Sequence, residues 1–99
     1  LYISGQIPMN AETGVLVSDS VGNETHMVMK NLNAILLEAG YGFSDIVKCS
    51  IFLSDMENFP VVNEAYGSYF SHNYPARETI QVSKLPLGVN VEISAIAVK

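Results

Sequence analysis

The sequence predicts a single α+β domain in which a mixed β-sheet carries two helices on one face. Two segments repeat apolar residues at three- and four-residue spacing, and short segments of alternating apolar and polar residues surround them. The chain has 99 residues, a length that allows one hydrophobic core and no second one. We therefore assign residues 1–99 to one domain with the element order β-β-α-β-α-β-β.

The first two predicted elements are strands. Residues 1–7 (LYISGQI) have strand-like composition, and Pro8 ends the run. Thr13 and Gly14 form a turn that leads into a short second strand at residues 15–18.

A long amphipathic helix is predicted over residues 20–40. Asp19 or Ser20 is its N-cap, and Gly40 stands where a glycine commonly follows a helix. The helix has about five turns by the 3.6-residue repeat. Its apolar stripe consists of Val21, Thr25, Val28, Leu32, Ile35, Leu36 and Ala39.

The second half of the chain is predicted as strand, helix and two further strands. Residues 46–53 (IVKCSIFL) alternate, with Val47, Cys49, Ile51 and Leu53 on one face and Lys48, Ser50 and Phe52 on the other. Asp55 or Asn58 caps a second helix that runs to about residue 71. Its stripe is Phe59, Val62, Tyr66, Tyr69 and Phe70. Strands at residues 78–84 and 89–98 follow.

The last strand differs between its two ends. One face is apolar throughout, with Val89, Val91, Ile93, Ala95 and Ala97. The other face begins with Asn90, Glu92 and Ser94 and turns apolar at Ile96 and Val98. A strand end that is apolar on both faces is covered on both sides. We expect helices on one face and a neighbouring subunit on the other, with Glu92 facing a cleft.

The composition argues against a nucleic-acid partner. The formal net charge is −5, and the five basic residues are scattered: Lys30, Lys48, Arg77, Lys84 and Lys99. Apolar residues make up 48% of the chain, more than so small a monomer needs, which favours a buried subunit interface. The longest apolar runs are too short to span a membrane.

Cysteine and histidine usage indicates neither a disulfide nor a metal site. Cys49 is alone, so it forms no intrachain disulfide, and this fits a reducing cytoplasm. We expect Cys49 in the core because it shares a face with Val47 and Ile51. His26 and His72 lack the cysteine or carboxylate cluster of a metal centre. His72 is expected at the end of the second helix, where it complements the helix dipole.

Arg77 is the only arginine and follows Pro75 and Ala76. A guanidinium behind a stiff proline, at the start of a strand, can hold a carboxylate in a fixed geometry. In the alternative interpretation, Arg77 and Glu92 form an ion pair between neighbouring strands. The residue pattern alone favours the ion pair, because charge pairs are commoner than active sites.

Four sequence blocks resemble the Rid family, also called YjgF/YER057c/UK114. They are SGQIP, DIVKCSIFLSDMENFPVVNEAY, PARETIQVSKLP and VEISAIAV, and they keep the family's order and spacing over residues 1–99. The resemblance implies a chorismate-mutase-like fold and a homotrimer whose sheets close a central barrel, with active sites between subunits. It also implies hydrolysis of 2-imino acids and their enamine tautomers, such as 2-iminobutanoate and 2-iminopropanoate, to 2-keto acids and ammonia. No cofactor and no metal are implied.

Site residues follow from the resemblance by matching position. Arg77 corresponds to the residue that binds the substrate carboxylate, and Glu92 to the one that orients or activates water. Gly5 and Thr79 would line the pocket through their backbones, and Asn63 would help to shape it. A non-catalytic protein that binds small keto or amino acids, as a sensor or a chaperone-like partner, is the alternative function. Ribonuclease activity, also attached to this family, is disfavoured by the acidic composition.

Three departures from the family pattern bear on the site. Glu78 replaces a residue that is usually small, and it is expected to face away from Arg77 because neighbours on a strand alternate. Thr79 replaces a frequent cysteine. The chain also begins LYISGQIP without an initiator Met, so we expect an upstream segment. In the family that segment carries a Gly-Pro-Tyr-Ser block whose tyrosine lines the pocket.

Overall fold

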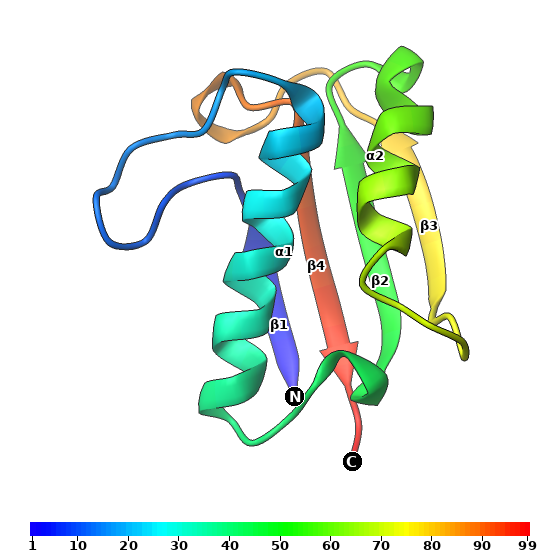
Figure 1. The fold of residues 1–99 in the computed structure, drawn as a ribbon. Coiled ribbons are helices and arrows are strands. Elements are labelled where there is room, and N and C mark those ends of the chain that lie inside the picture. The colour runs from blue at the N-terminus through cyan, green and yellow to red at the C-terminus, as the bar shows by residue number, and fades with distance from the viewer.

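The computed structural model describes residues 1–99 and shows a four-stranded sheet with two helices in front of it (Figure 1). The strands are β1 (Tyr2–Gln6), β2 (Ile46–Leu53), β3 (Ala76–Gln81) and β4 (Val91–Ala97). The helices are α1 (Val21–Glu38) and α2 (Phe59–Gly67), and short 3₁₀ turns are η1 (Phe43–Asp45), η2 (Met56–Asn58) and η3 (Pro86–Gly88). The predicted α+β class is confirmed. Neither helix has the length and hydrophobicity that crossing a membrane requires.

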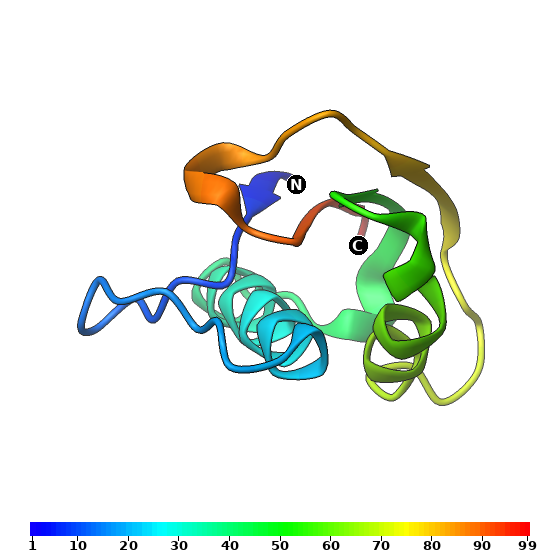
Figure 2. The ribbon, with the colours of Figure 1, turned by 90° about the horizontal axis from the view of Figure 1, so that it is seen from above.

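The sheet is mixed, with the strand order β1-β4-β2-β3. β4 pairs antiparallel with β1 and β2, whereas β2 and β3 are parallel. Parallel strands need a crossover connection, and α2 is that crossover. Seen from above, α1 and α2 lie side by side on the same side of the sheet (Figure 2). The prediction of two helices on one face is therefore confirmed.

The core lies between the helices and the sheet. Apart from Val47, its side chains include those that the predicted alternation assigns to one face of β2 and β4, together with much of the stripe of α1. Fully buried examples are Val28, Leu32, Leu36, Cys49, Ile51, Leu53, Val91 and Ile93. Burying one such aliphatic side chain contributes about 1.5–3 kcal/mol. The opposite face of the sheet carries no α-helix of this chain (Figure 2).

Helix α1 has the predicted ends. The Ser20 hydroxyl accepts a hydrogen bond from the backbone N–H of Asn23 at 3.1 Å, so Ser20 is the N-cap. Gly40 follows the C-cap with a φ of +80°, a conformation that glycine adopts without steric cost.

One predicted strand is absent. Residues 15–18 form only an isolated bridge, between Met9 and Leu16. The Asn10 side chain instead accepts hydrogen bonds from the N–H groups of Glu12 and Thr13, at 2.9 and 3.2 Å. Two backbone hydrogen bonds flank the bridge, from Asn10 N–H to Val15 O at 2.9 Å and from Val17 N–H to Pro8 O at 2.8 Å, and the pairing extends no further. The sheet therefore has four strands rather than five.

Other predicted boundaries shift. Helix α2 ends at Gly67, not near residue 71, so the dipole role predicted for His72 is wrong. Strand β3 covers Ala76–Gln81 rather than residues 78–84, so Arg77 lies inside a strand.

The side chain of Val47 is 47% exposed, although the alternation of β2 predicts that it faces the core. The β2–β4 register shifts just before Lys48, and such a bulge moves the preceding residue to the other face.

Candidate active site

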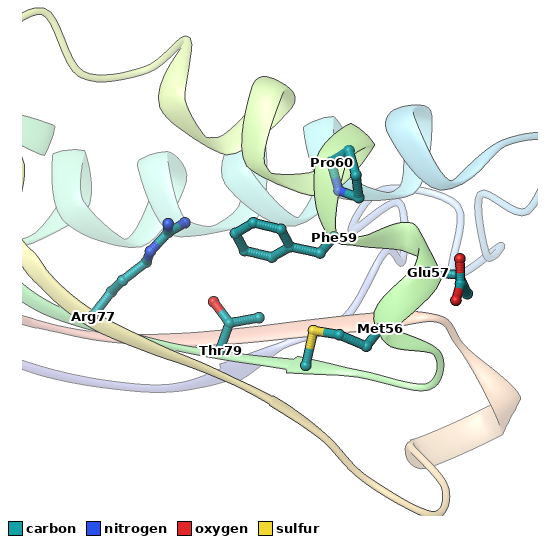
Figure 3. A pocket seen from close by; sticks show the side chains of 6 residues that line it. All are labelled: Met56, Glu57, Phe59, Pro60, Arg77 and Thr79. Atoms are coloured by element: carbon teal, nitrogen blue, oxygen red, sulfur yellow. The ribbon is translucent and has the colours of Figure 1, made fainter.

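An open cleft of about 600 Å³ lies between α2 and β3. Figure 3 shows its lining side chains, which come from the turn η2, the first turn of α2 and strand β3. They are Met56, Glu57, Phe59, Pro60, Arg77 and Thr79. The walls are largely apolar, and Arg77 is the cleft's only cation.

The guanidinium of Arg77 is held by one face of α2. Its Nη1 donates a hydrogen bond to Asn63 Oδ1 at 2.6 Å. Its central carbon lies 5.3 Å from the ring centre of Phe59 and 5.4 Å from that of Tyr66. Positions 59, 63 and 66 share one face of a helix because they are four and three residues apart. Because Arg77 is exposed, each aromatic contact adds about 0.5–1 kcal/mol of cation–π attraction, which orients the guanidinium.

Arg77 has no carboxylate partner in this chain. The structure contains one ion pair, between Lys48 Nζ and Glu78 Oε2 at 3.2 Å. Glu78 therefore faces away from Arg77, as predicted, and Lys48 lowers the pKa of its carboxyl. The donors of Arg77 that do not contact Asn63 remain available to an anion.

The alternative ion pair between Arg77 and Glu92 is wrong for this chain. Strand β2 separates β3 from β4, so the two residues are not on neighbouring strands. Arg77 is paired with Cys49, which faces the helices, whereas Glu92 is paired with Phe52 on the opposite face.

Thr79 lies two residues after Arg77 and on the same face of β3. Its Oγ1 atom is buried and has no hydrogen-bond partner. Leaving a buried hydroxyl unpaired costs about 1–3 kcal/mol, so this atom is an unsatisfied polar group in the wall of the cleft.

Glu92 and Gly5 meet on the other face of the sheet. A Cβ atom on Gly5 would lie 2.7 Å from Cδ of Glu92 and would collide with its carboxylate. Glycine at position 5 therefore lets the Glu92 carboxylate lie directly against β1, and any larger residue would displace it. The β1–β4 register shifts between Ile3 and Gln6, and this irregularity brings Gly5 to the Glu92 side.

The predicted site residues thus fall into two groups. Arg77, Asn63 and Thr79 lie together on the helix side of the sheet, whereas Gly5 and Glu92 lie together on the uncovered side. A single chain does not bring the two groups into one cavity.

Cys49 and Tyr66 lie beneath the guanidinium, in the core. Cys49 is fully buried, as predicted, and burial raises the pKa of its thiol despite the nearby charge of Arg77. Burial likewise raises the pKa of the Tyr66 hydroxyl, with the neighbouring Cys49 as the second cause. The Tyr66 hydroxyl has no hydrogen-bond partner. A thiol whose pKa is raised is a poor nucleophile, which supports a packing role for Cys49.

The sequence pattern does not single out Met56 and Glu57, which line the cleft. It places Phe59, which also lines the cleft, and Tyr66, which contacts Arg77, only in an apolar stripe. The four- and three-residue spacing of Phe59, Asn63 and Tyr66 was visible in the sequence. Only the fold shows that this face of α2 lies over Arg77.

Comparison with known proteins gives the family. Residues 1–99 match the family model described as Endoribonuclease L-PSP. The 2-iminobutanoate/2-iminopropanoate deaminase of Homo sapiens is 44% identical over 99 residues, which cover 100% of this chain and 72% of that protein.

Solved structures agree with that assignment. YyfA of Yersinia pestis, described as a member of the conserved Rid protein family, superposes with a TM-score of 0.95 at 46% identity, covering 97% of this chain and 77% of that one. TdcF of E. coli, solved with bound serine, has a TM-score of 0.94 at 38% identity, covering 99% of this chain and 79% of that one. This chain therefore belongs to the Endoribonuclease L-PSP family, the Rid family that its four sequence blocks resemble.

Proposed function

We propose that the protein hydrolyses 2-imino acids and their enamine tautomers to 2-keto acids and ammonia, with 2-iminobutanoate and 2-iminopropanoate as substrates. The observation that carries the proposal is the Arg77 guanidinium, held by Asn63, Phe59 and Tyr66 at the wall of a cleft without a carboxylate partner. The name of the human relative, at 44% identity, supports the same reaction.

Each predicted site residue has a role in this reaction. Arg77 binds the substrate carboxylate through paired donors, and a hydrogen bond to a charged group contributes about 1.5–3 kcal/mol. Asn63 keeps the guanidinium in position, and Gly5 and Thr79 line the pocket. Glu92 orients the attacking water and accepts its proton as oxygen adds to the imine carbon. That proton passes to the imine nitrogen and gives a carbinolamine. The hydroxyl proton then moves to the same nitrogen as the C–N bond breaks, so that the water oxygen becomes the keto oxygen and ammonia leaves. The reaction requires no cofactor and no metal.

The proposed active unit is a cytoplasmic homotrimer with sites between subunits. Arg77 and Glu92 lie on opposite faces of one sheet, so Glu92 acts with the Arg77 of another copy. The uncovered face carries apolar side chains that a second copy can bury: Tyr2, Phe52 and Ile96. Tyr2 is 84% exposed in the single chain, which supports a subunit contact there.

A coupled assay tests the proposal. Threonine dehydratase generates 2-iminobutanoate, semicarbazide competes for it, and formation of 2-ketobutyrate is followed with and without the protein. We expect faster keto-acid formation and less semicarbazone with the wild type, and neither effect with Arg77→Ala. Lys84→Ala, which removes an exposed cation elsewhere, is the matched control. Equal rates with and without a folded, assembled wild type would contradict the proposal.

Binding without turnover is the second candidate. The carboxylate anchor is complete within one chain, whereas the water-orienting Glu92 is not beside it, and TdcF was solved with serine bound. Glu92→Gln separates the two functions, because it should abolish hydrolysis and leave binding of 2-ketobutyrate intact. A wild type that binds 2-ketobutyrate but never accelerates imine hydrolysis would establish the second candidate.

The family description also names an endoribonuclease. The net charge of −5 and the five scattered basic residues disfavour RNA as a substrate. RNA cleavage by a homogeneous preparation, lost in Arg77→Ala, would reverse this conclusion.

A further inference from the structure

The cleft has opposite charges at its two ends. Figure 3 shows Arg77 at one end of the row of lining side chains and Glu57 at the other, with Phe59, Thr79 and Met56 between them. A small acid whose carboxylate binds Arg77 would therefore extend its side chain over apolar walls toward Glu57.

The turn that carries Glu57 is fixed relative to the strand that carries Arg77. The Met56 N–H donates to Gln81 Oε1 at 2.8 Å, which ties η2 to the end of β3. The Glu57 N–H donates to Asp55 Oδ1 at 2.9 Å, which closes the turn. Both ends of the cleft thus belong to one hydrogen-bonded unit, and the separation of the two charges is built into the fold.

The charge of Glu57 is not neutralised within the chain. The only ion pair is Lys48–Glu78, and the Asp55 carboxylate that caps the same turn adds a second negative charge nearby. A ligand group that arrives at this end of the cleft therefore meets a negative potential.

We propose that Glu57 is a specificity-determining residue that discriminates against substrates with a second carboxylate. The cleft selects 2-imino acids whose side chains are apolar or cationic, and it disfavours those derived from glutamate or aspartate. This inference rests on the proposed function, because it assumes that the substrate carboxylate binds Arg77.

The expected discrimination is modest because Glu57 is exposed and solvent screens its charge. We expect the neutral substitution Glu57→Gln to raise relative activity toward a dicarboxylic imino acid by roughly fivefold at low ionic strength. Glu57→Lys should raise it further. Both gains should shrink as salt is added.

The test compares two imino acids generated by amino-acid oxidases, one from methionine and one from glutamate, in the semicarbazide competition assay. Wild type, Glu57→Gln and Glu38→Gln are run in parallel. Glu38 is an exposed carboxylate at the end of α1, outside the cleft, and its substitution changes the net charge equally. We expect the ratio of kcat/KM for the glutamate-derived over the methionine-derived substrate to rise in Glu57→Gln only.

Failure of this inference is distinguishable from failure of the proposed function. An active wild type whose substrate ratio is unchanged by Glu57→Gln, or is changed equally by Glu38→Gln, overturns the role of Glu57 alone. A wild type inactive on both substrates overturns the deaminase proposal. In that case calorimetry with 2-ketobutyrate and 2-oxoglutarate tests the role of Glu57. Glu57→Gln must then shift the ratio of the two Kd values, and Glu38→Gln must leave it unchanged.

Discussion

The two faces of the sheet in this protein differ in what they hold. On the helix side of β4, Val91 and Ile93 are fully buried within one chain. On the other side of the same strand, Glu92, Ser94 and Ile96 are only half-buried, and no helix covers them (Figure 2). One face is a complete hydrophobic core, and the other is the face on which we propose that a second copy packs.

The two faces of the sheet thus carry different kinds of residue: core side chains on one, and candidate site residues where the core does not reach. Successive side chains of a strand point to opposite faces, so β4, whose one face lies in the core, carries the candidate residue Glu92 on the other. On the edge strand β3 the helix side is still open, and there Arg77 contacts Phe59, Asn63 and Tyr66. The anchor and the candidate acid–base residue therefore lie on opposite sides of one layer.

The largest expected effect comes from mixing two inactive variants. Arg77→Ala and Glu92→Gln should each lower kcat/KM by about 100-fold or more, because each removes a charge-assisted contact. If every site takes Arg77 from one copy and Glu92 from another, the two variants can be refolded together in equal amounts. Each site then receives an intact Arg77 with a probability of about one half and an intact Glu92 with the same probability, so roughly a quarter of the sites should be active. The coupled assay measures the recovery.

Refolding each variant separately is the control for this experiment. A properly assembled mixture with no recovered activity would show that both residues act within one copy. That result would contradict a site formed between subunits.

Ile93 and Ile96, on opposite faces of β4, provide the next test. Ile93→Ala removes a fully buried side chain and should lower the free energy of unfolding by about 2–5 kcal/mol. Ile96→Ala should act mainly through association, so its effect on the urea midpoint should depend on protein concentration. Two variants with equal, concentration-independent losses would mean that the uncovered face is not a subunit contact.

Asn63 tests how far the position of Arg77 matters. Asn63→Ala removes the 2.6 Å hydrogen bond to Arg77 and should raise KM about tenfold, the equivalent of about 1.4 kcal/mol. Asn63→Asp should be more harmful, because its carboxylate competes with the substrate for the guanidinium. Asn33→Ala on α1 is the control. An unchanged KM in Asn63→Ala would show that the two aromatic rings alone position Arg77.

The smallest effect concerns the buried thiol. Burial raises the pKa of Cys49 above its ordinary value of 9.0, so the unfolded chain ionises first as pH rises. The stability due to the neutral thiol is fully present below that ordinary value and is lost as pH rises through the folded-state pKa. Urea unfolding between pH 8 and 10 should therefore show a steeper loss for wild type than for Cys49→Ala. Parallel pH profiles would contradict this.

The features that the sequence predicts correctly are those that depend on local periodicity. The stripe of α1, the alternation along β2 and β4, and the outward direction of Glu78 all follow from repeats of 3.6 or 2 residues. Arg77 stood out as the only arginine, and family blocks added Glu92, Gly5, Asn63 and Thr79 as candidates. The strand predicted at residues 15–18 is absent because that segment has a single bridge partner, Met9, and no strand of the sheet beside it.

The sequence by itself determined the class of fold, the long helix and, apart from Val47, which residues of β2 and β4 face the core, since neighbouring residues decide these features. The strand order, the exposed position of Val47 and the separation of Arg77 from Glu92 came only from the tertiary structure. So did the stacking of Phe59 and Tyr66 on Arg77 and the place of Glu57 at the far end of the cleft. Each of these depends on contacts between segments distant in the chain, and no local pattern encodes which segments will meet.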